Sequence, residues 1–417
     1  MRTSVGPTHG DGSGGNALRP FGDQGDMRNV LALSVSLLAW PLGAQSATVA
    51  TLTLGAAESV FPEPFSSVSG FRALRDGRVL LGDAREKQIH LLDFRSGVAR
   101  PVGREGSGPG EFKSLTRFVG LPGDTTVMED PANGRFLTIL PDGRPGATFT
   151  APPGVALTMG GLVGSDREGR LLFESTRARP AGSGPANQVD LVRWDRQRAR
   201  LDTLTMLARP QDEVTAARVL SGGRIQLATN RPLAPRDVVA QGGPAEPAVV
   251  RAAPYRVDRV RTDGRPVAGP PASAPSVRVT SAEQEAFVRG QVRSGAIVVS
   301  GGAPVSNSSG SAGGGARVVE SPQDMMTPDM VWPTHKPPFT GAALAAEDGS
   351  VWVLRSRAHD DAIPVYDVFD ASGRVTQRVR LAAATRLVGV TATHLYVVRT
   401  DADELQHLER HLRPRAP

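Results

Sequence analysis

The chain has 417 residues, 48 Lys and Arg against 42 Asp and Glu, and no cysteine. The absence of cysteine excludes disulfides, thiolate metal sites and cysteine nucleophiles. The net charge of +6 is spread along the chain without a run of Lys or Arg, so nucleic acid is not an expected partner. Glycine (47 residues) and proline (34 residues) together make up about a fifth of the chain, which indicates many turns and disfavours a helical fold.

Residues 1–46 are predicted to be a leader. Residues 1–26 are polar and Gly-rich, and we expect them to be an upstream extension, with Met27 as the natural start. Residues 27–46 have the layout of a secretory signal peptide, with a cationic start, an apolar run and small residues after it. An uncleaved anchor is the alternative, although the apolar run is shorter than the about 20 residues of a membrane span. We therefore expect export to the periplasm or the medium, and a mature chain without a membrane span.

A pattern of four short strands repeats over residues 47–413. In its first copy a strand ends at Leu74, the turn Asp76-Gly77 follows, and further apolar runs occupy 79–82, 88–94 and 98–102. An Asp-Gly pair favours a tight hairpin because glycine accepts a positive φ and aspartate can hydrogen-bond the turn backbone. Further copies begin near residues 118, 161, 248, 342 and 387, and the fourth of the six copies is the least regular.

Six copies of a four-stranded antiparallel unit predict an all-β fold, a six-bladed β-propeller. The strand predicted at 48–54 has no hairpin partner. We expect this N-terminal strand to close the last blade, which would remove two free sheet edges and give a monomer. A β-sandwich or two separate β domains is the alternative.

One segment, residues 269–320, interrupts the repeats. It is rich in Gly, Ser, Ala and Pro, a composition that cannot fill a core, and we expect its 300–316 portion to be disordered. Within it, residues 281–292 predict a short helix, with Ser281 as the N-cap and Glu283 in the first turn.

Three segments resemble a bacterial family of six-bladed β-propellers related to NHL-repeat proteins. They are GREGSGPGEF (103–112), AAPYRV (252–257) and KPPF (336–339), and the resemblance extends over about residues 48–413. It implies a secreted or surface propeller, and it supplies no catalytic residues. The long Gly/Ser insertion and the irregular fourth blade depart from the family.

The motifs that could carry chemistry are incomplete. GREGSGPGEF lacks the spacing of a phosphate loop, and we expect its glycines to allow a tight crossing between blades while Phe112 enters the core. His407 and His411 are four residues apart, but we place them on a strand, where they would not share a zinc ion. Asp401 and Asp403 resemble the start of a calcium loop without its glycine or its distal glutamate.

Loops that follow the second strand of each blade are the expected ligand-binding rim, because loops carry function in propellers while strands pack. Acidic and basic residues alternate at these positions and would suit a protein, peptide or glycan ligand. Salt bridges among these residues are the alternative. The candidates are Asp83, Arg85, Asp130, Glu174, Arg251, Arg355 and Arg357.

Two functions follow from this prediction. The first is an exported binding scaffold that needs no cofactor and catalyses no reaction. The alternative is a metal-dependent hydrolase of the lactonase or gluconolactonase type, in which Asp83, Asp130 and Glu174 would hold a divalent ion.

Overall fold

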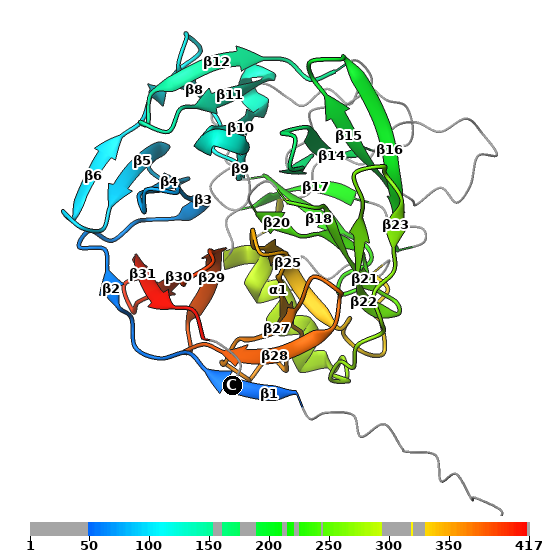
Figure 1. The fold of residues 1–417 in the computed structure, drawn as a ribbon. Coiled ribbons are helices and arrows are strands. Elements are labelled where there is room, and N and C mark those ends of the chain that lie inside the picture. Colours follow the sequence, from blue (N-terminus) through cyan, green and yellow to red (C-terminus); the bar gives the residue numbers. More distant parts are fainter. Residues whose placement is uncertain are drawn as a thin grey trace, which may run out of the picture. The chain divides into compact units, whose positions relative to one another are not determined.

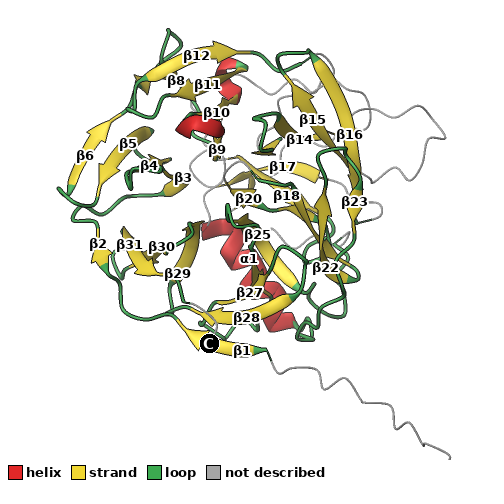
Figure 2. Cartoon of the chain, viewed as in Figure 1, coloured by secondary structure: helices red, strands yellow, loops and turns green. Residues whose placement is uncertain are grey.

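Antiparallel sheets stand side by side around a central axis, as Figure 1 shows for the unit Thr48–Pro417. This computed structural model describes residues 49–152, 161–175, 189–210, 215–220, 225–242, 245–293, 318–319 and 330–414. Strands dominate these residues, and helices are few (Figure 2). The prediction of a β-propeller is therefore confirmed. The predicted leader and the 300–316 segment lie outside the described residues.

Five sheets are blades of four antiparallel strands. The first two are β3 (Val68–Ala73), β4 (Val79–Asp83), β5 (Gln88–Asp93) and β6 (Val98–Pro101), then β9 (Phe118–Gly120), β10 (Thr126–Asp130), β11 (Arg135–Ile139) and β12 (Pro145–Phe149). The third has β13 (Leu162–Ser165), β14 (Leu171–Ser175), β15 (Val189–Asp195) and β16 (Arg200–Leu207). The fourth has β19 (Val238–Val239), β21 (Ala248–Ala252), β22 (Tyr255–Val260) and β23 (Pro266–Val267). The last has β29 (Thr385–Val390), β30 (His394–Thr400), β31 (Gln406–Leu412) and β2 (Ser59–Val60).

A sheet of six strands stands where the sequence predicts a further four-stranded blade. Its centre is the antiparallel set β25 (Phe339–Ala345), β26 (Val351–Arg355), β27 (Val365–Phe369) and β28 (Val375–Arg380). Two parallel strands extend it, β1 (Ala50–Thr53) beside β28 and β20 (Gln241–Gly242) beside β25. The prediction of six four-stranded blades is thus wrong in its count: the described residues form five such blades, because two added strands make this sheet six-stranded.

The N-terminal segment closes the ring through a different strand from the one predicted. Strand β2 pairs antiparallel with β31 and completes the last blade. The predicted strand at 48–54 corresponds to β1, which pairs parallel with β28 instead. The predicted closure by an N-terminal strand is correct, but β2 makes it and not the strand predicted at 48–54. Our prediction missed β2 because a strand of two residues is too short to show an apolar pattern.

Smaller elements complete the described fold. Two strands of two residues each, β7 (Arg104–Glu105) and β8 (Glu111–Phe112), pair in parallel. Phe112 is buried, as predicted. A separate three-stranded sheet, absent from the sequence prediction, holds β17 (Thr215–Leu220), β18 (Ile225–Thr229) and β24 (Val318–Val319). The short 3-10 helices η1 and η2 span Pro122–Asp124 and Pro131–Asn133.

Helix α1 (Ser281–Arg293) lies within one residue of its predicted range. Its N-cap is Thr280 and not Ser281, because the Thr280 hydroxyl accepts the amide of Glu283 at 3.4 Å. The Glu283 carboxylate accepts the backbone amide of His359 at 2.8 Å and forms an ion pair with Lys336. These contacts fasten α1 to the segments before β25 and after β26.

The predicted Asp-Gly hairpins are present. The glycine of each has a positive φ, at Gly77 (88°), Gly143 (84°), Gly264 (86°) and Gly349 (82°). The preceding aspartate also acts as expected, since the Asp76 carboxylate accepts the Arg78 amide at 3.0 Å.

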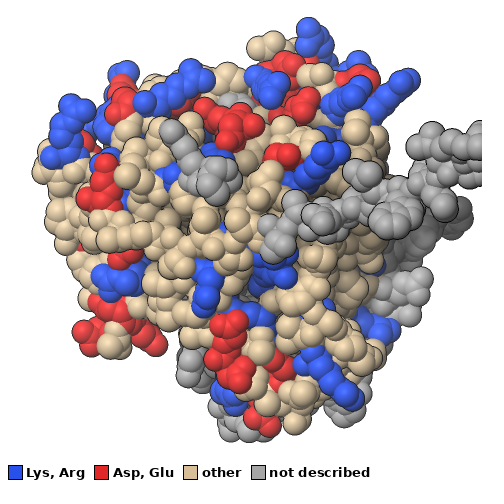
Figure 3. All heavy atoms as spheres, turned by 60° about the horizontal axis from the view of Figure 1, so that its bottom comes forward, with Lys and Arg blue, Asp and Glu red and all other residues tan. Residues whose placement is uncertain are grey.

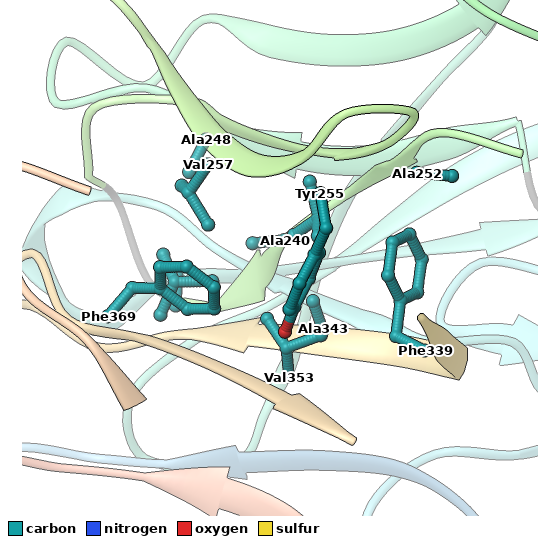
Figure 4. Packing of buried hydrophobic residues seen from close by; sticks show 12 residues of the cluster. Ala240, Ala248, Ala252, Tyr255, Val257, Phe339, Ala343, Val353 and Phe369 are labelled. Carbon is teal, nitrogen blue, oxygen red and sulfur yellow. The ribbon is translucent and has the colours of Figure 1, made fainter. Parts of the chain in front are cut away.

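Apolar side chains fill the spaces between neighbouring sheets. Figure 4 shows one such layer, in which Tyr255 of β22 lies between Phe339 and Phe369 of the six-stranded sheet. The Tyr255 hydroxyl donates to the buried Asp367 carboxylate at 3.0 Å, and burial raises the pKa of this tyrosine. Six such layers lie between the five blades and the six-stranded sheet, so each of these sheets buries both of its faces against its neighbours.

Candidate functional site

A cavity of about 620 Å³ lies along the innermost strands of the ring. Strands β3 and β29 form much of its wall, and their residues alternate. In β29, Arg386, Val388 and Val390 are the more accessible residues, while the positions between them are buried. In β3 the accessible positions include Ser69 and Phe71. This two-residue period turns one row of side chains toward the axis and the other into the packing between blades.

Strand β20 occupies part of the centre of the ring. It pairs with β25, and both Gln241 and Gly242 line the cavity. A Cβ at Gly242 would collide with the carbonyl oxygen of Ala345, so only glycine allows this approach of the two backbones. The cavity is consequently the space that β20 leaves open beside β3 and β29.

The described lining of the cavity carries an excess of positive charge. Five of its residues are arginines and one is a glutamate, Glu347. Three of these arginines have acidic partners. Asp124 lies 3.5 Å from Arg72 and 4.0 Å from Arg75, and Arg410 lies 3.0 Å from Glu58.

The two other arginines, Arg117 and Arg386, have no acidic side chain within 4.0 Å among the described residues. Arg117 also makes no side-chain hydrogen bond there, although Glu174 and Glu129 act on it at longer range. Arg386 donates to the Val68 carbonyl at 2.6 Å and to Gln406 at 3.3 Å. Burial lowers the pKa of both guanidinium groups, because surrounding protein disfavours the charged form even where the cavity admits solvent.

The rim aspartates predicted from the sequence organise the backbone. Asp83 is buried, and its carboxylate accepts the amides of Ser66 at 2.6 Å and Ser67 at 3.1 Å. Asp130 is buried as well and accepts the amides of Lys113 at 3.1 Å and Ser114 at 2.9 Å. Each of them ends the second strand of a blade and fixes the segment that enters the first strand of that blade. Neither lines the cavity.

Three other rim candidates form ion pairs. Glu174 pairs with Arg209 at 2.5 Å, and Arg355 pairs with Asp367 at 2.7 Å. Arg251 lies between Asp237 at 2.7 Å and Asp258 at 2.8 Å. Burial alone would lower the pKa of Arg251, but its bonds to the two carboxylates raise it.

The two remaining rim candidates are less engaged. Arg85 is exposed, and its backbone amide donates to the Asp83 carboxylate at 3.0 Å. The Arg357 carbonyl accepts Lys336 at 2.8 Å. The structure therefore does not gather the seven candidates into one site: salt bridges and backbone bonds occupy most of them, the alternative that the sequence left open.

No group of three or more acidic or histidine side chains within the described ranges could hold a metal ion. Asp83, Asp130 and Glu174, named for the hydrolase alternative, instead bind amides or an arginine. His407 and His411 lie on β31 as predicted, where His407 contacts Asp401 at 2.7 Å and His411 contacts the Gly55 carbonyl at 3.0 Å.

The sequence does hold a signal for the cavity arginines that our prediction overlooked. Residues 117–120 read Arg-Phe-Val-Gly, and residues 386–389 read Arg-Leu-Val-Gly. A related Gly-Leu-Val-Gly occupies 161–164. The shared glycine ends a short innermost strand or bends it, and the arginine three residues earlier stands where that strand begins. Aligning the repeats at this glycine would have placed both arginines at one end of the cavity.

The fold and the cavity define the protein as a β-propeller with a cavity along its innermost strands. No protein-family model matches the chain, and no curated protein matches its sequence. The propeller part of the predicted resemblance is confirmed by the structure, whereas membership of an NHL-related family stays a prediction.

Three solved structures illustrate the likeness of fold. One is a Bacteroides fragilis protein proposed to be exported, with 13% identity, a TM-score of 0.45, and 87% of this chain and 94% of that chain covered. A DUF4221 family member from Bacteroides vulgatus has 7% identity, a TM-score of 0.43, and 87% and 96% coverage. Virginiamycin B lyase from Staphylococcus aureus has 10% identity, a TM-score of 0.38, and 85% and 98% coverage. At these identities the likeness assigns no function.

Across the part of the chain that the structure describes, none of the helices is both long and apolar enough to cross a bilayer.

Proposed function

We propose that this chain is a ligand-binding propeller whose ligand enters the central cavity. One observation carries the proposal: a cavity of about 620 Å³ is lined by side chains of several innermost strands, among them Arg386 and Ser69. Ligand sites are typically concave, have this size, and combine apolar walls with a few converging polar groups.

The proposal keeps the binding function expected from the sequence and moves its place from the rim to the cavity. The rim aspartates Asp83 and Asp130 already accept several backbone amides each, so a ligand would have to compete with the fold for them. The lactonase alternative has weaker support, because the three carboxylates that would hold its metal ion already have partners. Asp83 and Asp130 accept backbone amides, and Glu174 forms an ion pair with Arg209.

Export remains part of the proposal on the strength of the sequence pattern at 27–46. N-terminal sequencing of protein recovered outside the cytoplasm tests it. A first residue shortly after position 44 supports the signal peptide, and a chain that still carries residues 1–26 contradicts it.

A blocked cavity tests the binding proposal. Ser69→Trp places a large ring at an accessible position of β3, while Ser96→Trp places the same ring in an exposed turn as the control. A fragment library is screened against the three proteins by ligand-observed NMR. We expect the hits of the unmodified protein to persist with Ser96→Trp and to disappear with Ser69→Trp. Hits that survive Ser69→Trp would place the binding site elsewhere and overturn the proposal.

A further inference from the structure

We propose that the cavity selects a small dianion, a molecule with an apolar body and two carboxylate or phosphate groups that Arg117 and Arg386 bind. This inference deepens the proposed function and rests on it. It starts from an imbalance of charge: two arginines of the cavity wall have no acidic side chain within 4.0 Å among the described residues, whereas Arg72, Arg75 and Arg410 have one.

The fold brings the two arginines to the same end of the cavity. Arg386 belongs to the start of β29, and Arg117 directly precedes β9. Innermost strands of neighbouring blades run in the same direction along the axis, so their first residues share one end. Strand β3 stands between the two, with Arg386 donating to Val68 at its start and the Thr116 carbonyl beside Gly70.

Among the described residues, no acidic group forms an ion pair within 4.0 Å with either arginine. Glu174 has the larger charge effect on Arg117, but its carboxylate pairs with Arg209 at 2.5 Å. Glu129 also acts on Arg117, from beyond 4.0 Å, and its carboxylate accepts the Leu162 amide at 3.4 Å. Glu347 acts on Arg72, and it lies in the β25–β26 turn, at the opposite end of these strands. No carboxylate of the described residues acts on Arg386, and the nearby Tyr366 hydroxyl only partly offsets the lowering of its pKa by burial.

A guanidinium in partly buried surroundings gains most from an anionic acceptor. Its planar donors match a carboxylate or a phosphate, and such charge-assisted bonds are about twice as strong as neutral ones. To the described residues Arg117 makes no side-chain hydrogen bond, and Arg386 makes only the two to Val68 and Gln406, both from one nitrogen of its guanidinium. Two cations in need of partners favour a ligand with two negative charges.

The remaining wall indicates the body of the ligand. Phe71, Val388 and Val390 line the same cavity, and the Phe71 ring packs against Tyr396 with centroids 4.9 Å apart. An aromatic or aliphatic body would cover these surfaces while its charged groups reach the arginines. A cavity of about 620 Å³ has the size that suits a small molecule.

The test uses two probes of one shape that differ in charge. Isophthalate carries two carboxylates on a benzene ring, and isophthalamide is its neutral diamide. Isothermal titration measures both against the full chain and against Arg117→Gln, Arg386→Gln and the exposed-rim control Arg85→Gln. The charge-preserving variant Arg386→Lys, together with the unfolding midpoint of each protein, separates loss of binding from loss of fold.

We expect isophthalate to bind at least about tenfold more tightly than isophthalamide, and each of Arg117→Gln and Arg386→Gln to weaken it by about tenfold or more. Arg85→Gln should bind as the unmodified protein does, Arg386→Lys should keep part of the affinity, and added salt should weaken binding. Equal affinity for the two probes, no affinity for either, or full affinity in both glutamine variants overturns the inference. The proposed function falls separately, if fragment hits survive Ser69→Trp.

Discussion

The rim and the cavity of this propeller use charged side chains in different ways. At the rim, Arg251 meets two carboxylates and Arg355 meets Asp367, so each cation is neutralised within the fold. In the cavity, Arg117 and Arg386 face open space without such a partner among the described residues. The difference teaches that a ring of charged residues is no evidence of a binding site by itself. What distinguishes a site is charge that the fold leaves unbalanced beside a space.

The largest expected effect of breaking this comparison lies at Asp367, the carboxylate that neutralises the rim candidate Arg355. Asp367 is fully buried and accepts Arg355 at 2.7 Å, Arg378 at 3.1 Å and Tyr255 at 3.0 Å. Asp367→Ala leaves two cations without their partner, and we expect the free energy of unfolding in urea to fall by about 3–5 kcal/mol. The control Asp263→Ala, at an exposed turn, should change it little. Equal losses in both variants would show that the buried Asp367 network contributes no more to the free energy of unfolding than an exposed carboxylate.

A second rim variant separates stability from binding. Asp130→Ala removes the acceptor of two backbone amides and of the Asn133 side chain, which should cost about 2 kcal/mol. Asp130 does not line the cavity, but it holds the segment that leads to Arg117, so isophthalate affinity measured by titration should fall less than in Arg117→Gln. Glu105→Ala, which removes an exposed pair with Lys87, is the matched control for stability. A loss of affinity in folded Asp130→Ala protein that exceeds the loss in Arg117→Gln would restore the rim as the site.

Strand β20, which lines the cavity, offers a third test. Gly242→Ala forces β20 away from β25, because the new Cβ would occupy the place of the Ala345 carbonyl. We expect a loss of about 1–3 kcal/mol in thermal or urea unfolding, together with altered affinity for fragments that bind the cavity. Gly55→Ala, where a Cβ has open space, is the control. Unchanged stability in Gly242→Ala would mean that β20 is not held tightly against β25.

The smallest expected effect is the pH dependence of the α1 attachment. Burial alone would raise the pKa of Glu283, but bonds from Lys336 and His359 outweigh it and lower the pKa below the ordinary value. A lowered folded pKa contributes stability above the unfolded pKa, and this stability is lost as pH falls through the folded pKa. We therefore expect unfolding experiments from pH 7 down to about pH 3 to show a loss of about 1 kcal/mol that Glu283→Gln lacks. Glu285→Gln, an exposed helix position, should retain the same pH dependence as the unmodified chain.

The sequence predicted the repeating part of this fold because local chemistry determines it. Asp76-Gly77 and its counterparts set the hairpins, and alternating apolar residues mark the four strands of most blades. The sequence did not reveal where the added strands pair. Strands β1 and β20 join β28 and β25 in parallel across long separations in the chain, and such pairing depends on the assembled ring.

The candidate site was predicted less well for a related reason. Asp83 and Asp130 were correctly placed at the ends of second strands, but whether a carboxylate binds a ligand or an amide depends on the segment packed against it. The cavity arginines lie at the starts of innermost strands far apart in the chain, and only the closed ring brings Arg117 and Arg386 to one end of the cavity. Their shared Arg-x-Val-Gly pattern becomes informative once the blades are aligned.

A crystal structure of the full chain grown with isophthalate tests the central claim most directly. The account predicts the ring of the ligand in the cavity beside Phe71, with its carboxylates against the guanidinium groups of Arg117 and Arg386. Isophthalate bound at the rim beside Asp83 and Arg85 would contradict it. So would a cavity without isophthalate in crystals grown at a concentration that saturates the protein in solution.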